Sequence, residues 1–280
     1  MVISNSMNNQ SVSFPIGFTF TPMKEEELTF DLHMWAMDIC EMFKTYFHKP
    51  YFYPYILKSD GEFAGVSELI INGKVAWLGS VIVLEKFRNR GLGTSMVKVI
   101  MQKADELGCD TQILYATDMG KPIYEKLGFR HEANFLLYEH DELIPEQRYC
   151  NVIPIEPKDR EEILKLDKEI TGEDRTLLLE DYWEGAVQYV ENGKLTGYIL
   201  PALGIGFTAA LTEQAAENLI SYKISINKPY FIFPESNTLC KNILESKGYK
   251  YTRDNLRMVY GKGLAFQEKY VFSRGFGYSG

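Results

Sequence analysis

A turn rich in glycine and arginine, placed between a predicted strand and a predicted helix, is the segment best suited to chemistry. It reads Arg88-Asn89-Arg90-Gly91-Leu92-Gly93-Thr94 and follows an apolar β-branched run, residues 81–83. Two glycines allow backbone conformations that are closed to other residues, and they let a ligand approach the main chain. Amides that converge at a helix N-terminus favour an anion such as a pyrophosphate. We therefore predict a phosphate-binding turn, to which Arg88 and Arg90 add positive charge.

Two other nucleotide-binding turns also join a strand to a helix. The dinucleotide-binding turn requires G-x-G-x-x-G, which this segment lacks, and a P-loop ends in Gly-Lys-Ser/Thr, which is also missing. The spacing present is Arg88-x-x-Gly91-x-Gly93. It excludes both of these sites.

This spacing resembles the acyl-CoA pyrophosphate motif, R/Q-x-x-G-x-G/A, of the GNAT superfamily of N-acyltransferases. Further along, residues 116–129 resemble the second GNAT signature, with Tyr124-Glu125-Lys126-Leu127-Gly128-Phe129 matching its YxKLGF form. Residues 117–124 also resemble the corresponding segment of a tandem, two-domain bacterial subfamily. One departure is Glu85, which stands where many GNATs have proline.

The resemblance implies direct transfer of an acetyl group from acetyl-CoA, as co-substrate, to an amine of a small molecule or protein, without a metal. It implies that the turn binds the pyrophosphate and that the strand before it pairs with the pantetheine arm. A main-chain N–H of that strand would face the thioester oxygen, and such a donor commonly lowers the barrier by about 3 kcal/mol. The cofactor-binding positions are Val81, Ile82, Val83, Arg88, Asn89, Arg90, Gly91, Leu92, Gly93 and Thr94.

Two side chains are candidates for proton transfer. By resemblance, Tyr124 occupies the position of the general acid that protonates the departing thiolate, although a tyrosine that only packs against the sulfur remains the alternative. An alkyl amine of pKa about 10.4 must lose a proton before it attacks. Glu68, among apolar neighbours on a predicted strand, is our candidate base because burial raises a carboxyl pKa. Its rivals are Glu62, Glu85 and Asp118, the last of which also fits a helix N-cap.

The remaining segments of the first half must position these residues. We expect a strand at 18–20, helical structure at 24–47, an aromatic loop at 46–55, strands at 56–58, 63–71 and 75–83, a helix at 94–107, a strand at 113–115, a short helix from Pro122 to Gly128, and a strand at 135–138. Asn72-Gly73 marks a hairpin between two of these strands.

A polar, proline-containing connection at 141–157 separates a second unit. There we expect helices at 159–170, 174–189 and 212–222, and strands at 197–200, 206–208 and 230–233. Residues 244–250 repeat the pattern of 124–130, whereas the counterpart of the turn, residues 208–213, has neither glycine nor arginine. The fold class we predict is α/β, of the mixed-sheet α+β kind, with tandem GNAT-like domains at 14–140 and 150–280. Each is a central mixed sheet flanked by helices, and the second is degenerate.

The second unit is also expected to close the acceptor channel. It would place Trp183, Tyr198, Asp174 or Arg175 opposite the thioester. A structural ion pair between Asp174 and Arg175 is the simpler interpretation of those two.

Composition narrows the class of partner. The 280 residues carry a net charge of -8, which argues against nucleic acid and fits either a cationic amine or ordinary solubility. No apolar run is long enough to span a membrane and no signal peptide is evident, so we expect no membrane partner and a cytoplasmic location. The four cysteines and four histidines show no metal-ligand spacing. A homodimer stays open.

Two other functions remain open at this stage. The protein could bind acyl-CoA as a sensor or interaction module without turnover, or it could transfer the acyl group to an alcohol. The sensor differs from the two enzymes in having no turnover, and the two enzymes differ in their acceptor. All three functions use the same cofactor site.

Overall fold

The computed structural model describes residues 12–34, 37–140 and 148–277. Its strands are β1 Phe18–Pro22, β2 His33–Met34, β3 Met37–Asp38, β4 Phe52–Ser59, β5 Glu62–Asn72, β6 Val75–Val83, β7 Thr111–Ala116, β8 Arg130–Glu139, β9 Val152–Pro154, β10 Val187–Glu191, β11 Lys194–Leu200, β12 Phe207–Ala210, β13 Phe231–Pro234, β14 Lys250–Gly261 and β15 Val271–Ser273. The α-helices are α1 Ile39–Tyr46, α2 Leu92–Glu106, α3 Lys121–Lys126, α4 Arg160–Thr171, α5 Thr176–Leu179, α6 Glu213–Ser225 and α7 Thr238–Ser246. Single 3₁₀ turns lie at Glu25–Glu27, Glu85–Phe87 and Glu268–Tyr270. None of the described helices is both long and apolar enough to cross a membrane.

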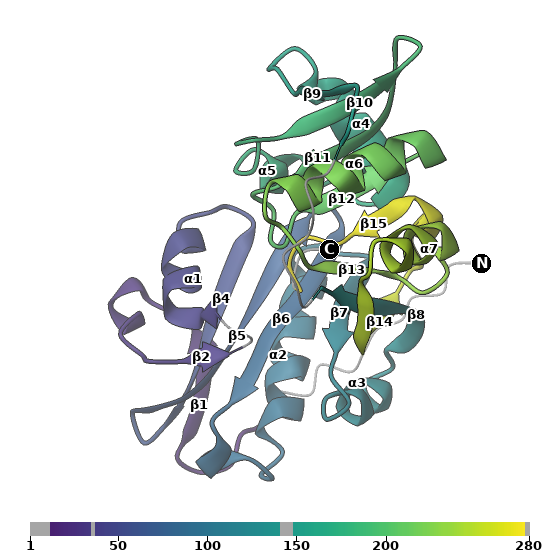
Figure 1. The fold of residues 1–280 in the computed structure, drawn as a ribbon. Helices are drawn as coiled ribbons and strands as arrows, with labels where there is room; N and C mark the ends of the chain where they lie inside the picture. Colours follow the sequence, from purple (N-terminus) through teal and green to yellow (C-terminus); the bar gives the residue numbers. More distant parts are fainter. Residues whose placement is uncertain (1–11, 35–36, 141–147, 278–280) are drawn as a thin grey trace, which may run out of the picture.

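The strands form two main sheets (Figure 1). The larger sheet has the order β1-β4-β5-β6-β7-β14-β8-β13, and its neighbours are antiparallel except for the parallel pair β6 and β7. The smaller sheet has the order β15-β12-β11-β10-β9 and is antiparallel throughout. The architecture is therefore mixed α/β, with a large mixed sheet flanked by helices, as the sequence predicted.

Helices cover both faces of the larger sheet. On one face, Phe43 of α1 packs in a core cluster that includes Val66 of β5 and residues of the second half. On the other face, Ile100 of α2 packs in a separate cluster with Leu69 of β5. We call these the α1 face and the α2 face. Because successive strand residues point to opposite faces, each position on β5 and β6 can be assigned to one of them.

Two strands of the second half lie in the sheet of the first half. β14 lies between β7 and β8 and pairs with both, and β13 continues the sheet beyond β8 (Figure 1). Ladder hydrogen bonds therefore join the halves in addition to side-chain packing. The predicted boundary between residues 140 and 150 stays a prediction.

Most predicted elements are confirmed. β6 has the predicted limits, β5 and β7 extend theirs by one or two residues, and α2 begins two residues before the predicted start. Gly73, in the predicted hairpin, has a positive φ of 61°, as a tight turn requires.

Of the helical structure predicted across residues 24–47, the structure has the 3₁₀ turn Glu25–Glu27 and α1 from Ile39, and the prediction is wrong for the described residues between them. Leu28, Phe30 and Leu32 are buried while the residues between them are exposed, which is the alternation of an extended chain. Asp38 then accepts a hydrogen bond from the Glu41 N–H, and this N-cap starts α1.

The aromatic segment at 46–55 was predicted as a loop because of its prolines, and this is wrong from Phe52 onward. Pro54 lies within β4 opposite Glu68. The Pro54 carbonyl accepts from the Met23 N–H, so the main chain of Pro54 faces the β1 side of β4. Pro54 lies just beyond the last β1–β4 pair, which joins Pro22 to Tyr55. A missing N–H costs no ladder bond there, so the strand accommodates proline.

In the second half, the helix predicted for 174–189 is also wrong. Only Thr176–Leu179 is helical, and Gly185, with φ of 66°, leads directly into β10. Of the connection predicted at 141–157, residues 141–147 lie outside the described residues. The remaining part, residues 148–157, contains the short strand β9.

The internal repeat extends to the backbone. The Phe129 N–H donates to the Tyr124 carbonyl at 3.0 Å, and the Tyr249 N–H donates to the Leu244 carbonyl at 3.0 Å. The glycines before the two aromatic residues have φ of 90° and 86°. Both segments therefore end a helix in the same way before a strand begins.

Candidate active site

The turn between β6 and α2 presents a row of free amides. Gly91 adopts a left-handed conformation with φ of 74° and precedes α2, and Asn89 is also left-handed with φ of 63°. Within the described part of the chain, the N–H groups of residues 89–94 have no hydrogen-bond acceptor, and the first bonded amide is that of Ser95, which reaches the Gly91 carbonyl at 3.1 Å. Six consecutive amides at a helix N-terminus are suited to an anion.

The two glycines leave space beside these amides. A Cβ built on Gly91 would meet nothing within 4 Å, and one built on Gly93 would meet only Ile123, at 3.7 Å. Neither position is filled by the protein itself. The space left by the missing side chains is what a ligand needs to reach the main chain.

The two arginines of the turn play different roles. Arg88 donates from Nε to the Val83 carbonyl at 3.0 Å and so ties the turn to the end of β6. Arg90 is exposed, and its guanidinium lies 5.8 Å from the ring centroid of Phe18 and 6.0 Å from that of Phe87. Arg90 is the freer of the two to meet a ligand.

β6 and β7 separate just before the turn. Their parallel pairing runs from Val75 and Thr111 to Trp77 and Ile113 and ends there. On the opposite edge β6 stays paired with β5, interrupted by a bulge at which Ser80 has φ of 42°. A wedge therefore opens between the C-terminal ends of β6 and β7, and we call it the β6–β7 wedge.

The main chain of residues 81–83 alternates between β5 and this wedge. A Cβ on Gly65 would lie 2.1 Å from the Ile82 carbonyl oxygen, so the Ile82 carbonyl faces β5. Alternation then turns the main-chain groups of Val81 and Val83 toward the wedge. The Val83 carbonyl is already bound by Arg88, and the N–H groups of Val81 and Val83 are directed at the wedge.

Tyr124 lies next to the wedge on the α2 face. It belongs to α3, is 9% exposed, and packs in the cluster formed with α2. Gly120 makes room for its ring, because a Cβ there would lie 2.9 Å from Tyr124 Cε2. The hydroxyl has no hydrogen-bond partner among the described residues, and burial raises the pKa of Tyr124 to about 12.

Glu68 lies on β5 between Val66 and Ile70, which belong to the α1 face. It is fully buried, and neither carboxylate oxygen has a partner among the described residues. Burial raises the pKa of Glu68 to about 8, and the Ser80 hydroxyl, which is near the carboxylate but outside hydrogen-bond geometry, opposes this rise. Such unpartnered buried oxygens are rare in folded proteins unless a ligand, water or proton meets them.

The rival carboxylates lie in less suitable surroundings. Glu62 and Glu85 are exposed, and Glu62 is paired with Lys86. Asp118 is exposed and does not cap α3 as predicted, because Thr117 Oγ1 accepts from the Gly120 N–H instead, at 3.3 Å.

The acceptor-side residues predicted in the second half are mostly engaged in structure. Tyr198 donates to Asp167 at 2.5 Å, and Asp167 also forms a buried ion pair with Arg175. Asp174 pairs with Lys168 at 2.9 Å, so the predicted pair of Asp174 with Arg175 is wrong.

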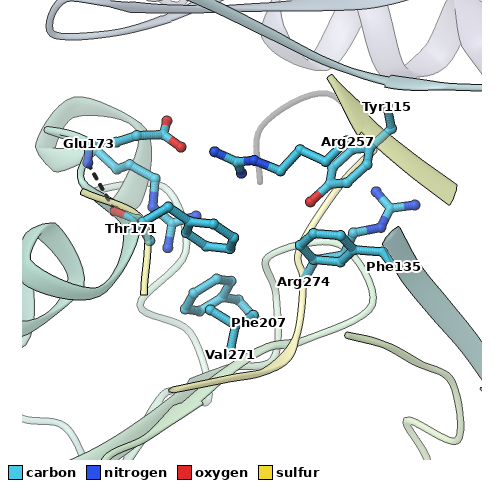
Figure 2. Close-up of a pocket in the computed structure, with 10 residues that line it drawn as sticks. Tyr115, Phe135, Thr171, Glu173, Phe207, Arg257, Val271 and Arg274 are labelled. Carbon is cyan, nitrogen blue, oxygen red and sulfur yellow. Dashed lines mark hydrogen bonds between the residues drawn. The ribbon is translucent and has the colours of Figure 1, made fainter. Parts of the chain in front are cut away.

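Sequence reasoning missed one buried cluster. Glu173 accepts from Asn72 and Trp77 at 2.9 and 2.7 Å, Arg257 faces it, and Arg274 is buried farther away, beside Tyr115 (Figure 2). These residues are far apart in the sequence, and the pairing of β14 with β7 brings Arg257 among them. No local pattern marks them.

The counterpart of the turn in the second half is closed. Thr212 caps α6 by accepting from the Ala215 N–H at 3.2 Å. A side chain of the protein thus takes one of the first amides of α6, whereas the first amides of α2 stay free. The second half keeps the helix and has no comparable anion site at its start.

Family models match both halves of the chain. Residues 20–129 match the acetyltransferase (GNAT) family, and residues 163–273 match an acetyltransferase (GNAT) domain. The chain is a tandem member of the GNAT superfamily. The turn, the β6–β7 wedge and Tyr124 all lie within the first GNAT match.

Solved structures share the whole fold of this tandem GNAT protein. A protein from Pyrococcus horikoshii, described as a candidate acetyltransferase, aligns over 99% of this chain and 100% of its own, with a TM-score of 0.82 and 19% identity. A GCN5-related N-acetyltransferase from Sphaerobacter thermophilus covers 91% of this chain and 100% of its own, with a TM-score of 0.59 and 13% identity. A tandem GNAT protein from the clavulanic acid biosynthesis pathway covers 88% and 99%, with a TM-score of 0.57 and 13% identity. Curated proteins gave no match to the sequence.

Proposed function

We propose that this protein is an acetyl-CoA-dependent N-acetyltransferase whose cofactor site lies in the first half. The observation that carries the proposal is the row of six free amides at the start of α2, next to the β6–β7 wedge. GNAT proteins in general transfer acetyl groups from acetyl-CoA. The amides, the two unfilled glycine positions and Arg90 suit the pyrophosphate of that co-substrate.

The wedge gives the pantetheine arm a path from the turn into the sheet. An extended arm there would pair with the exposed main chain of β6, and its thioester oxygen would accept from the Val81 N–H. Negative charge develops on this oxygen when an amine attacks the carbonyl carbon, so a fixed donor stabilises the transition state more than the ground state.

Three proton transfers complete the reaction. Glu68, ionised, removes a proton from the attacking ammonium group, directly or through one water. The new C–N bond then forms, the C–S bond breaks, and Tyr124 donates its phenolic proton to the departing thiolate. The second proton that the nitrogen must lose to become a neutral amide passes through water to the Tyr124 phenolate and restores its hydroxyl. A tyrosine with a pKa near 12 stays protonated at neutral pH and is therefore ready to donate.

The role proposed for the second half is to complete the acceptor side. β14 supplies a strand next to β7, and residues of the second half pack in the α1-face cluster with Val66 and Trp77. We propose that the acceptor amine enters on this face.

The cofactor site is tested with a charge placed in the turn. Gly93→Glu puts a carboxylate at the second residue of α2, where the helix dipole favours it, so the protein should remain folded. The same carboxylate should repel the pyrophosphate. Gln102→Glu, exposed on the same helix, is the matched control with the same change of charge.

Acetyl-CoA binding is measured by calorimetry on the three proteins, and thiol release is measured with a panel of amines. We expect micromolar binding, on the order of -8 kcal/mol, for the wild type and Gln102→Glu, and none for Gly93→Glu. Equal binding by all three proteins would contradict the assigned site. Binding without turnover on the whole panel would favour the sensor module over the enzyme.

A further inference from the structure

A small cavity lies where the two halves meet on the α1 face (Figure 2). Its lining includes Tyr115 of β7, Arg257 of β14, and Glu173, Phe266 and Arg274 from the second half. The volume of about 10 Å³ admits one water-sized group, such as a single oxygen atom of a ligand. The walls are both aromatic and charged, so a polar ligand atom has partners there.

Two of the three arginines around the cavity have an ion-pair partner. Arg175 pairs with Asp167, and Arg257 pairs with Glu132 through Nε. Glu173 faces the Arg257 guanidinium across the cavity, while its carboxylate is held by Trp77 and Asn72 (Figure 2).

Arg274 is the exception. It is 8% exposed, and its Nε and Nη1 have no acceptor among the described residues, as is also true of Arg257 Nη2. Its guanidinium carbon lies 4.4 Å from the ring centroid of Tyr115, which offers only the weak attraction of a π face. Burial lowers the pKa of Arg274, and no carboxylate opposes this effect. A buried cation without hydrogen-bond acceptors is strongly unfavourable unless an anion meets it.

The cavity lies close to the proposed site of acyl transfer, so an anion bound there would be near the reacting groups. The Trp77 ring lies 5.4 Å from that of Tyr115, and Trp77 belongs to the last pair before β6 and β7 separate. The cavity therefore lies against the closed end of the wedge, toward which the thioester of a bound acyl-CoA would point. It is on the same face as Glu68, our candidate base.

We infer that the cavity binds a carboxylate oxygen of the acceptor, held by Arg274 and Arg257, so that the acceptor is a carboxylate-bearing amine such as an amino acid. This inference rests on the proposed function, because it uses the site of acyl transfer to orient the amine. The carboxylate supplies the missing counter-ion of Arg274. The amine of the same molecule then extends toward the wedge and Glu68.

The first test needs no turnover. Formate, the smallest carboxylate, is added at constant ionic strength against chloride, and the melting temperature is measured for the wild type, Arg274→Met and Arg253→Met. Arg253 is an exposed arginine on β14 and is not part of the cavity lining, so its loss removes the same charge away from the cavity. Formate should raise the melting temperature of the wild type and Arg253→Met and leave that of Arg274→Met unchanged. No stabilisation of the wild type by formate would overturn the site.

The second test uses pairs of amines that differ only in a carboxylate, such as phenylalanine with phenethylamine and lysine with cadaverine. Their binding to the CoA-saturated protein is measured by calorimetry, and their acetylation by thiol release. Because charge-assisted hydrogen bonds are involved, the amino acid of at least one pair should be preferred about 10- to 100-fold, and Arg274→Met should abolish this preference whereas Arg253→Met should keep it.

The outcomes separate the two proposals. A formate effect without any preference for the amino acid, in binding or turnover, would show that the cavity holds a free anion and would overturn the acceptor assignment. A preference seen in binding when no amine turns over would support the carboxylate site and count against the transferase. A preference that persists in Arg274→Met would overturn the role of Arg274.

Discussion

Tyr115 and Arg257 are paired neighbours on β7 and β14, although one comes from the first GNAT half and the other from the second. Through this pairing the guanidinium of Arg257 comes to lie 5.2 Å from the ring centroid of Trp77, at the closed end of the wedge. The candidate acceptor side of the first half is thus built partly from the second. The candidate cofactor turn belongs to the first half alone.

Tyr124→Phe should lower kcat about 10²- to 10⁴-fold, the usual contribution of a positioned general acid. Binding of acetyl-CoA should be unchanged, because only an unpartnered hydroxyl is removed. Steady-state kinetics and calorimetry on the same sample separate the two effects. An unchanged kcat would reduce Tyr124 to a packing residue.

Glu68 should give the rate a rising dependence on pH. A base must be ionised to act, and burial places the pKa of Glu68 at about 8, so kcat/KM should increase with pH and level off above that value. Glu68→Gln should be slower by about 10² or more and should lose this inflection. If the inflection persists in the variant, another group is the base.

The same carboxyl should make stability depend on pH. The folded-state pKa, about 8, lies above the unfolded value of about 4.5, so between these values the unfolded state has released a proton that the folded state keeps. Stability then falls as pH rises through this window, by about 5 kcal/mol in total, and the loss is complete above pH 8. Melting temperatures measured from pH 5 to pH 9 should fall more steeply for the wild type than for Glu68→Gln. Parallel curves would show that Glu68 titrates normally.

Gly120→Ala should displace the Tyr124 ring. The added Cβ would lie 2.9 Å from Cε2, and the backbone at Gly120, with φ of -81°, accepts alanine without strain. We expect a fall in kcat with little change in acetyl-CoA binding. Gly263→Ala, whose Cβ would meet nothing within 4 Å, is the control. Equal kinetics in the two variants would show that the position of the ring does not matter.

Residues 1–140 expressed alone should not fold. Removing the second half leaves β7 and β8 without β14, and two unpaired edges next to a buried core favour aggregation. Circular dichroism and size-exclusion chromatography would detect this, and adding residues 148–280 as a separate chain should restore a soluble complex. A monomeric, cooperatively melting fragment would contradict the interpretation.

The sequence was informative where signals are local. The glycine turn, the hairpin at Gly73 and the helix α2 depend on neighbouring residues, and each was predicted within two residues of its observed limits. The alternation of Leu28, Phe30 and Leu32 was also local, yet it was read with the wrong period.

Features that depend on distant strands could not be predicted. Pro54 fits a strand only because β1 ends next to it, and Arg257 reaches Trp77 only because β14 inserts beside β7. Two GNAT-like segments in tandem lead one to expect two separate sheets, one for each half. Nothing in residues 250–261 indicates that their partners lie in the other half.

The insertion of β14 also bears on how this gene can change over time. In the described part of the second half, Thr212 caps the start of α6, so this helix does not begin with an open anion-binding turn. Deleting that half would nevertheless remove the strand that separates β7 from β8. A half without such a turn at the start of α6 is therefore part of the other half's sheet, and substitutions in β14 also act on the fold of the first half.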